Sequence, residues 1–338
     1  MNKHNAYDLA QMQSLPLKYK IIMTKQRIKD WYDYWDGNVY VSISGGKDSQ
    51  VLAHIVKEMY PDVPSIFVNT GLEYDSVMLK GMELADEVLR PSMDFVSVVT
   101  KYGYPIISKP VANTVHGAKK GTTRYEKING TFVDPKTGKL SQYNYKKYKF
   151  LLNAPFRISD QCCDELKKKT AFQYYKKHKS YPFIGMLAEE SKKRKDAWIK
   201  TGCNAFEKKK PQSQPLAFWT EQDILHYIKQ YGLQIAEIYG DICYQDEDGM
   251  YYDNPLFNDS MKLTTTGVKR TGCIFCMFGI TQDTERFLRL KESEPKKYDY
   301  VMRGGKFDNE GMWIPHNGLG YKFVIDWINE HGGFDIKY

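Results

Sequence analysis

The sequence feature that most constrains the fold is a glycine turn between a short apolar strand and an amphipathic helix. Residues 39–43 read Val-Tyr-Val-Ser-Ile, which is typical of a buried strand, and apolar residues recur at helical spacing from about Asp48 to Met59. The turn between them is Ser44-Gly45-Gly46-Lys47-Asp48-Ser49. It places backbone N–H groups at a helix N-terminus, where unpaired donors and the helix dipole attract anions. We therefore expect this turn to bind phosphate or a similar anion.

The rest of the chain repeats this alternation of strands and helices. Further strands are predicted at 64–68, 94–99 and 181–186, and helices at 18–35, 76–88, 164–178, 221–231 and about 284–291. Strands that alternate with helices form βαβ units, whose strands are parallel. The sequence thus predicts an α/β fold with a doubly wound parallel sheet.

The length of 338 residues exceeds that of one ordinary domain. We expect an N-terminal helical segment (1–36), a nucleotide-binding α/β domain (37–212) and a C-terminal helical and loop region (213–338). Residues 112–150 form a basic, tyrosine-rich insertion with a predicted β-hairpin. The insertion is either a lid or a plain surface loop, because nothing in its composition demands contact with a ligand.

The turn differs from a Walker A loop, because its lysine directly follows the second glycine. It resembles the pyrophosphate loop (PP-loop) of the N-type ATP pyrophosphatases and of the phosphoadenosine-phosphosulfate (PAPS) reductase-like enzymes. This resemblance implies an adenine nucleotide alpha hydrolase-like, Rossmann-like fold that binds ATP, adenylyl sulfate or PAPS. It also implies that Ser44, Lys47 and Ser49 bind anion oxygens by side chain, that Gly45 and Gly46 contribute amides, and that Asp48 caps the helix or positions Mg²⁺.

Two further segments extend the predicted nucleotide site. Asn69-Thr70-Gly71 follows the second strand at the carboxyl edge of the sheet, where open α/β folds bind ligands. Family members often carry aspartate where this chain has Asn69. Residues 185–194 are similar to the family's Gly-x-x-x-x-Glu-Ser-x-x-Arg segment, which implies nucleotide contacts from Gly185, Glu190, Ser191 and Arg194. The resemblance implies that Lys47, Asp48 and Arg194 are the catalytic residues. The alternative for residues 185–194 is the solvated start of a basic helix.

The six cysteines include an adjacent pair, Cys162-Cys163, and a CxxC pair, Cys273 and Cys276. Together they resemble the [4Fe-4S] ligands of the iron–sulfur sulfonucleotide reductases and of the related DNA phosphorothioation enzyme. Arg157, Lys167 and residues 270–272 also fit that pattern, and cations offset the charge of a thiolate-bound cluster. Zinc is the rival metal and unligated thiols are a third reading. Cys203 and Cys243 stand alone and are expected to be small buried residues.

The N-terminus lacks a signal-peptide pattern and the chain lacks a membrane-length apolar run, so we expect a cytoplasmic protein with no membrane partner. In that reducing compartment, cysteines point to metal or redox chemistry before disulfides. The formal charge of +8 and the 26 tyrosines are compatible with an anionic partner such as nucleic acid. Charge runs are usually solvated faces, and this alternative is favoured unless the cations line a groove.

The resemblance implies three functions. The first is an AMP-forming ATP pyrophosphatase that adenylates an acceptor for sulfur transfer, with nucleic acid as one acceptor and a cysteine desulfurase as sulfur donor. The second is an adenylyl-sulfate or PAPS reductase that uses an internal thiol such as Cys203, or the thiol of a thioredoxin-like partner. It must depart from the family, because no cysteine follows Cys276 and the reductases' C-terminal Glu-Cys-Gly is missing. The third is a non-catalytic nucleotide sensor.

Overall fold

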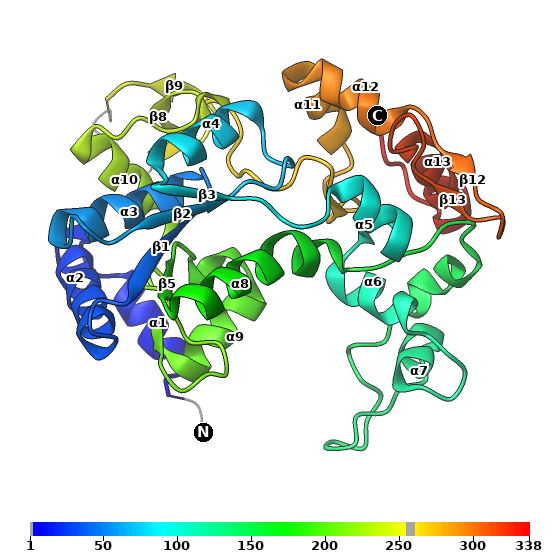
Figure 1. Cartoon of the computed structure of the whole chain (residues 1–338), viewed down its shortest axis with the longest axis horizontal. Coiled ribbons are helices and arrows are strands. Elements are labelled where there is room, and N and C mark those ends of the chain that lie inside the picture. The colour runs from blue at the N-terminus through cyan, green and yellow to red at the C-terminus, as the bar shows by residue number, and fades with distance from the viewer. Residues whose placement is uncertain (1–2, 255–260) are drawn as a thin grey trace. The chain divides into compact units, whose positions relative to one another are not determined.

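The computed structural model describes residues 3–254 and 261–338. They form two compact units, each assembled from interleaved stretches of the chain (Figure 1). The sheet unit consists of Met1–Asn69, Glu73–Arg90 and Thr170–Thr271, and the cysteine unit of Thr70–Leu72, Pro91–Lys169 and Gly272–Tyr338. None of the helices in the described ranges has the length and hydropathy needed to cross a bilayer.

The sheet unit is built on a six-stranded sheet in the order β3-β2-β1-β5-β7-β6. Its strands are β1 (Val39–Ile43), β2 (Ser65–Val68), β3 (Glu87–Leu89), β5 (Tyr181–Ile184), β6 (Asn204–Ala205) and β7 (Gln212–Ser213). The central strand β1 pairs in parallel with both β2 and β5, and only the β6–β7 pair is antiparallel. The predicted parallel α/β sheet is confirmed.

The helices of the sheet unit are α1 (Ala6–Gln13), α2 (Leu17–Tyr34), α3 (Lys47–Met59), α4 (Asp75–Leu84), α8 (Lys169–His178, whose first residue lies in the cysteine unit), α9 (Lys192–Thr201) and α10 (Glu221–Tyr231). Two short 3₁₀ turns, η3 (Ala188–Glu190) and η4 (Glu237–Tyr239), and a small sheet of β8 (Ile242–Gln245), β9 (Tyr251–Tyr252) and β10 (Lys262–Thr265) complete the unit.

The core explains why β1 and α3 form where the sequence predicts them. Val39, Val41 and Ile43 of β1 are buried, as expected for a parallel strand covered on both faces. Val51 and Ile55 of α3 are fully buried in the same cluster, and α3 lies along β1 (Figure 1). The apolar stripe of α3 therefore holds the helix against the sheet, and this fixes the start of the helix at the end of β1.

One predicted strand is wrong. Residues 94–99 belong to helix α5 (Phe95–Tyr102), and the third strand of the sheet is β3 instead. The Asp94 side chain accepts a hydrogen bond from the Ser97 N–H at 2.7 Å, which caps the helix, and burial of Phe95, Val98 and Val99 defines its apolar face. A short β-branched run cannot be distinguished from a buried helix by periodicity, so here the cap decides the structure.

The remaining predicted elements are found within a few residues of their expected bounds. The opening helix is α2, the strand at 181–186 is β5 and the helix at 221–231 is α10. The helix predicted at 76–88 ends earlier, at Leu84, and the last two residues of that range belong to strand β3 instead.

The cysteine unit is mainly helical. It contains α5, α6 (Lys109–His116), α7 (Thr123–Asn129), η1 (Lys146–Asn153), the π-helical η2 (Asp164–Lys168), α11 (Arg286–Ser293), α12 (Pro295–Met302) and α13 (Tyr321–Gly332). Short strands pair β4 (Ile106–Ile107) with β11 (Met277–Phe278) and β12 (Lys306–Phe307) with β13 (Trp313–Ile314). The predicted hairpin is limited to one antiparallel bridge, Val133 with Leu140, between α7 and η1.

Candidate functional site

The glycine turn at the end of β1 has a shape that only glycine allows. Gly45 has φ +74°, and a Cβ atom added there would lie 2.0 Å from the Val77 carbonyl oxygen. Gly46 is the N-cap of α3 and offers no side chain to cap the helix. The first amides of α3 are therefore left to another acceptor, as at helix N-termini that bind anions.

Replacing Gly45 with alanine will destabilise the sheet unit. The left-handed backbone costs an alanine about 1–2 kcal/mol, and the overlap with the Val77 oxygen adds to this cost. Gly232→Ala is a matched control, because Gly232 has φ +64° with no atom within 4 Å of the added Cβ. Urea unfolding of both variants checks the prediction; equal losses of stability would contradict it.

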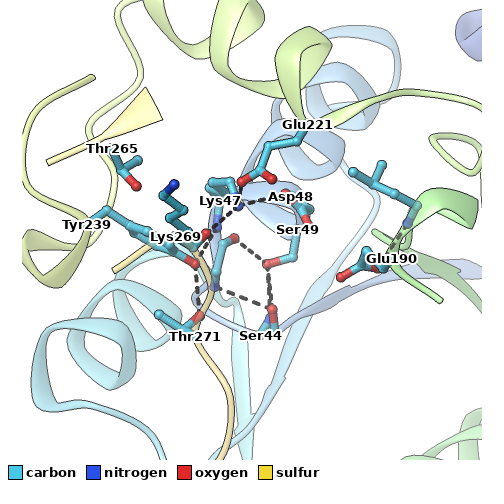
Figure 2. A network of polar contacts seen from close by, with 12 residues as sticks. Ser44, Lys47, Asp48, Ser49, Glu190, Glu221, Tyr239, Thr265, Lys269 and Thr271 are labelled. Atoms are coloured by element: carbon cyan, nitrogen blue, oxygen red, sulfur yellow. Dashed lines mark hydrogen bonds and ion pairs between the residues drawn. The ribbon is translucent and has the colours of Figure 1, made fainter. Parts of the chain in front are cut away.

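Two serines hold the turn in shape (Figure 2). The Ser44 and Ser49 hydroxyl oxygens lie 3.0 Å apart in a hydrogen bond, and the Ser44 N–H donates to Ser49 Oγ at 3.1 Å. The Ser49 hydroxyl donates to the Gly46 carbonyl oxygen at 2.9 Å, and the Gly46 N–H donates to Ser44 Oγ at 3.3 Å. These bonds arrange the turn before any ligand binds.

Lys47 is buried at the turn, with only 5% of its surface exposed. Its Nζ donates to the Lys269 carbonyl oxygen at 3.1 Å and forms an ion pair with Glu221 at 3.2 Å. The Tyr239 hydroxyl accepts from the Lys47 N–H at 3.4 Å and is hydrogen-bonded to the Thr271 hydroxyl at 2.8 Å. Figure 2 shows these side chains around Lys47, so the cation is held in place by groups that an anion could replace.

Asp48 is the second charged group of the turn. Burial raises the pKa of its carboxyl, the Lys47 charge opposes this, and Glu221 adds to it. Its Oδ1 atom is buried without a hydrogen-bond partner and lies 3.8 Å from Lys47 Nζ. A buried carboxylate oxygen that is not satisfied by the protein is suited to a cation, and Mg²⁺ prefers such oxygens together with substrate phosphates.

The predicted segment at 185–194 comes to the same turn. A Cβ on Gly185 would lie 2.9 Å from the Asp48 carbonyl oxygen, so β5 and the start of α3 are in close contact there. Glu190 forms an ion pair with Arg194, and the Ser191 hydroxyl caps α9 by accepting from the Arg194 N–H at 3.3 Å. Burial lowers the pKa of Arg194, and the nearby Asp48 charge raises it. The two basic groups predicted to bind the anion thus lie within the sheet unit at one turn.

The third predicted segment follows β2. The Asn69 N–H donates to the Leu89 carbonyl oxygen at 2.9 Å, which places Asn69 at the carboxyl edge of the sheet. Thr70 and Gly71 belong to the cysteine unit, and the Thr70 hydroxyl accepts from the Leu72 N–H at 3.3 Å. Their contacts with a nucleotide stay a prediction.

Sequence reasoning missed several groups of this site: Glu221, Tyr239, Lys269 and Thr271. Only the segment 270–272 carried a signal, as part of the family pattern. Lys269 contributes a backbone carbonyl, which no sequence pattern reveals. Tyr239 lies 192 positions from Lys47 in sequence, so only the tertiary fold brings the two together.

All four predicted metal-binding cysteines line one small cavity in the cysteine unit, with a volume of about 20 Å³. Cys162 and Cys163 lie just before η2, and Cys273 and Cys276 lie just before β11. The other lining residues are Leu72, Phe95, Pro105, Leu166 and Lys167. Among residues 3–254 and 261–338, no group of three or more His, Cys, Asp or Glu side chains is arranged to hold a metal ion.

The cysteines influence one another's ionisation. A hydrogen bond from Cys162 and the charge of Lys109 lower the pKa of the Cys163 thiol against the effect of burial. The same hydrogen bond, with burial, raises the pKa of Cys162, and burial raises that of Cys276 to about 11. Four thiols from two distant segments, with lysines beside them, are the type of donor that a thiolate-bound metal centre uses.

The two remaining cysteines are buried, as expected. Burial raises the pKa of Cys203, although Arg27 opposes this, and burial also raises that of Cys243. Raised pKa values disfavour the thiolate, so both are poor nucleophiles.

A family model described as the phosphoadenosine phosphosulfate reductase domain matches residues 38–101 and 82–277. No curated protein matches the chain. One similar solved structure is that of phosphoadenylyl-sulfate (PAPS) reductase from Candida auris in a phosphate complex, with 13% identity, a TM-score of 0.36 and coverage of 66% of this chain and 91% of that chain. Because the family model spans most of the chain, including the glycine turn and all four clustered cysteines, the chain belongs to the phosphoadenosine phosphosulfate reductase domain family, a family of enzymes.

Proposed function

We propose that this enzyme binds ATP, or a sulfonucleotide such as adenylyl sulfate or PAPS, at the turn Ser44–Ser49 and adenylates an acceptor for sulfur transfer. The observation that carries the proposal is the buried Lys47 at an uncapped helix N-terminus, in a chain that belongs to a sulfonucleotide-binding family. Amides and an ammonium group that converge in a site sheltered from water favour the terminal anions of a nucleotide.

Four residues of the turn have roles in this reaction, and Arg194 assists them. The amides of Gly45 and Gly46 and the Lys47 ammonium bind the terminal phosphates, after Lys47 exchanges Glu221 and the Lys269 carbonyl for phosphate oxygens. Arg194 likewise exchanges its ion pair with Glu190 for contacts with phosphate oxygens. The Oδ1 atom of Asp48 would hold Mg²⁺ together with phosphate oxygens. When bound, Mg²⁺ supplies positive charge next to the leaving group.

The reaction is a displacement at the α-phosphorus. An acceptor oxygen forms a bond to this phosphorus, the bond to the bridging oxygen breaks, and pyrophosphate leaves with the electron pair. The acceptor's proton passes to water. The outer sulfur of a persulfide on a donor such as a cysteine desulfurase then attacks the atom that carries the adenylated oxygen, the bond to that oxygen breaks, and AMP leaves. A thiol, such as that of a thioredoxin-like protein, then reduces the S–S bond that still joins donor and product, and is itself oxidised to a disulfide with the donor. Lys47 and Arg194 stabilise the charge that builds on pyrophosphate, so they act in the transition state.

We further propose that Cys162, Cys163, Cys273 and Cys276 hold a [4Fe-4S] cluster, with zinc as the alternative metal. Their common cavity and the neighbouring Lys109 and Lys167 support this assignment. When bound, such a cluster supplies a site that holds sulfur or passes electrons. A reduced thiolate set is consistent with action in the cytoplasm.

The experiment that tests the proposed reaction is an assay of ATP turnover. Protein and ATP with Mg²⁺ are expected to yield AMP and pyrophosphate in equal amounts, and more of both when the acceptor is present. Formation of ADP and phosphate would contradict the proposal.

Asp48→Asn will separate stability from activity. The fold raises the pKa of this carboxyl, so it disfavours the ionised form, and a neutral amide at neutral pH leaves the free energy of unfolding unchanged or higher. AMP formation is expected to fall about 100-fold, because the amide cannot hold Mg²⁺ as the carboxylate does. Urea unfolding and the ATP assay measure the two effects. A variant that is less stable and equally active would contradict this role.

A second candidate is reduction of adenylyl sulfate or PAPS, which the matched family model favours. It requires a thiol other than the buried Cys203, and a thioredoxin-like partner can supply one. Release of sulfite from the sulfonucleotide in the presence of thioredoxin would support this reaction, and AMP with pyrophosphate from ATP would support the first.

A further inference from the structure

The insertion at 112–150 carries nearly all of the net charge of the chain. It contains nine Lys and Arg residues against two Asp and Glu, an excess of seven, whereas the whole chain has a formal charge of +8. The other residues are therefore almost neutral as a group. Such a concentration of one sign in a single segment creates a local positive field.

The cations of the insertion are exposed and unpaired. Eight of the nine are exposed: Lys119, Lys120, Arg124, Lys136, Lys139, Lys146, Lys147 and Lys149. Within the described part of the chain, no ion pair involves any of the nine. Exposed lysines elsewhere often do have partners, such as Lys168 with Asp164 and Lys322 with Asp326. The insertion therefore presents its charge to solvent and to any anion that approaches.

The insertion is an ordered body within the cysteine unit. Ile128 of α7 is fully buried, and the Tyr145 N–H donates to the Lys127 carbonyl oxygen at 2.7 Å. Gly130 packs against the side chain of Lys146, whose carbon atoms lie 2.8–3.3 Å from the Cβ that Gly130 lacks. These contacts hold α7 and the start of η1 together, while the loop between them extends away from α7 (Figure 1). The cations on both sides of the loop thus belong to one surface.

Aromatic side chains alternate with these cations. Tyr143 is 54% exposed, and Lys127 Nζ lies 4.8 Å from the centre of the Phe132 ring. Nucleic-acid strands bind to lysines through phosphates and to exposed aromatic rings through stacked bases. An acidic protein surface would pair with the cations, but only a nucleic acid also brings bases that stack on an exposed tyrosine.

We propose that the 112–150 insertion binds a single strand of nucleic acid. The proposal extends the proposed function, because it names the acceptor's chemical class, and it rests on that function for the use made of the bound strand. The binding step itself requires no nucleotide, so it is tested separately from catalysis.

The test measures binding of a fluorescent 20-nucleotide single-stranded DNA by anisotropy, without ATP, over a range of salt concentrations. Two triple variants remove the charge on either side of the loop: Lys119→Gln/Lys120→Gln/Arg124→Gln and Lys146→Gln/Lys147→Gln/Lys149→Gln. Each is expected to raise the Kd about 10-fold or more at low salt and to reduce the slope of log K against log salt by about 2, since single strands contribute about 0.7 per phosphate contact. Tyr143→Ala is expected to raise the Kd about 5-fold or more, the loss of about 1 kcal/mol or more of stacking.

The control variant Lys291→Gln/Lys296→Gln/Lys306→Gln removes the same charge from exposed positions of the same unit outside the insertion. It should leave the Kd within about 2-fold of the parent, and unchanged thermal unfolding midpoints show that all variants are folded. Three results would each overturn the proposal: equal losses of affinity in the control and insertion variants, no DNA binding by the parent protein, or equally tight binding of polyglutamate, an acidic polypeptide. Nucleotide binding by the same variants stays intact in either case, so failure here is distinct from failure of the proposed reaction.

Discussion

Lys47→Ala is expected to reduce the rate of AMP formation by a factor of about 100–1,000, the cost of removing one preorganised charged donor from a transition state. The side chain is almost fully buried at the N-terminus of α3, and no other lysine of the turn can replace it. The loss should appear mainly in kcat/KM, because phosphate contacts both bind ATP and stabilise the leaving pyrophosphate.

Lys57→Ala is the matched control for this variant. Lys57 lies on the same helix and forms a surface ion pair with Asp86, so its removal takes away the same charge and one ion pair without touching the turn. Its activity should stay within about 2-fold of the parent, since surface ion pairs contribute little. Equal activities of Lys47→Ala and Lys57→Ala would show that the turn does not bind the reacting phosphates.

Cys162→Ser and Cys276→Ser are expected to abolish cluster binding. The parent protein, purified without oxygen, should contain about four irons and four sulfides per chain, the stoichiometry of one cubane, and absorb broadly near roughly 400 nm. Each variant removes one of the four thiols at the shared cavity and should lose most of the iron and of this absorption.

The control for the cysteine variants is Cys243→Ser. Cys243 is buried in β8 of the sheet unit and does not line the cavity, so iron content should not change. Zinc without iron in the parent protein would refute the cluster and support the zinc site. Full iron content in Cys162→Ser and Cys276→Ser would show that these thiols are not the ligands.

The central strand, the glycine turn and α3 could be predicted from the sequence because three local signals agree there. The strand is β-branched, the glycines end it, and the helix shows an apolar stripe that becomes the buried face of α3. The prediction of a strand at residues 94–99 was wrong because their apolar run fits a strand and a helix equally well. The hydrogen bond from Ser97 to Asp94 decides in favour of the helix.

The candidate site was predictable only where its residues follow one another in sequence. The turn and the segment around Arg194 carry family patterns, and the structure brings both to the start of α3. Glu221 and Tyr239 contact Lys47 from positions more than 170 residues away, so no local pattern marks them. The four cysteines differ, because their two pairs are distant in sequence and were still grouped by their resemblance to the ligand pattern of a family. The fold places all four at one cavity.

The most direct test of the account is a crystal structure with α,β-methylene-ATP and Mg²⁺. The terminal phosphates are expected to lie at the N-terminus of α3, within hydrogen-bond distance of the Gly46 amide and Lys47 Nζ, with Mg²⁺ at Asp48. A nucleotide bound elsewhere, with Lys47 still paired to Glu221, would contradict it.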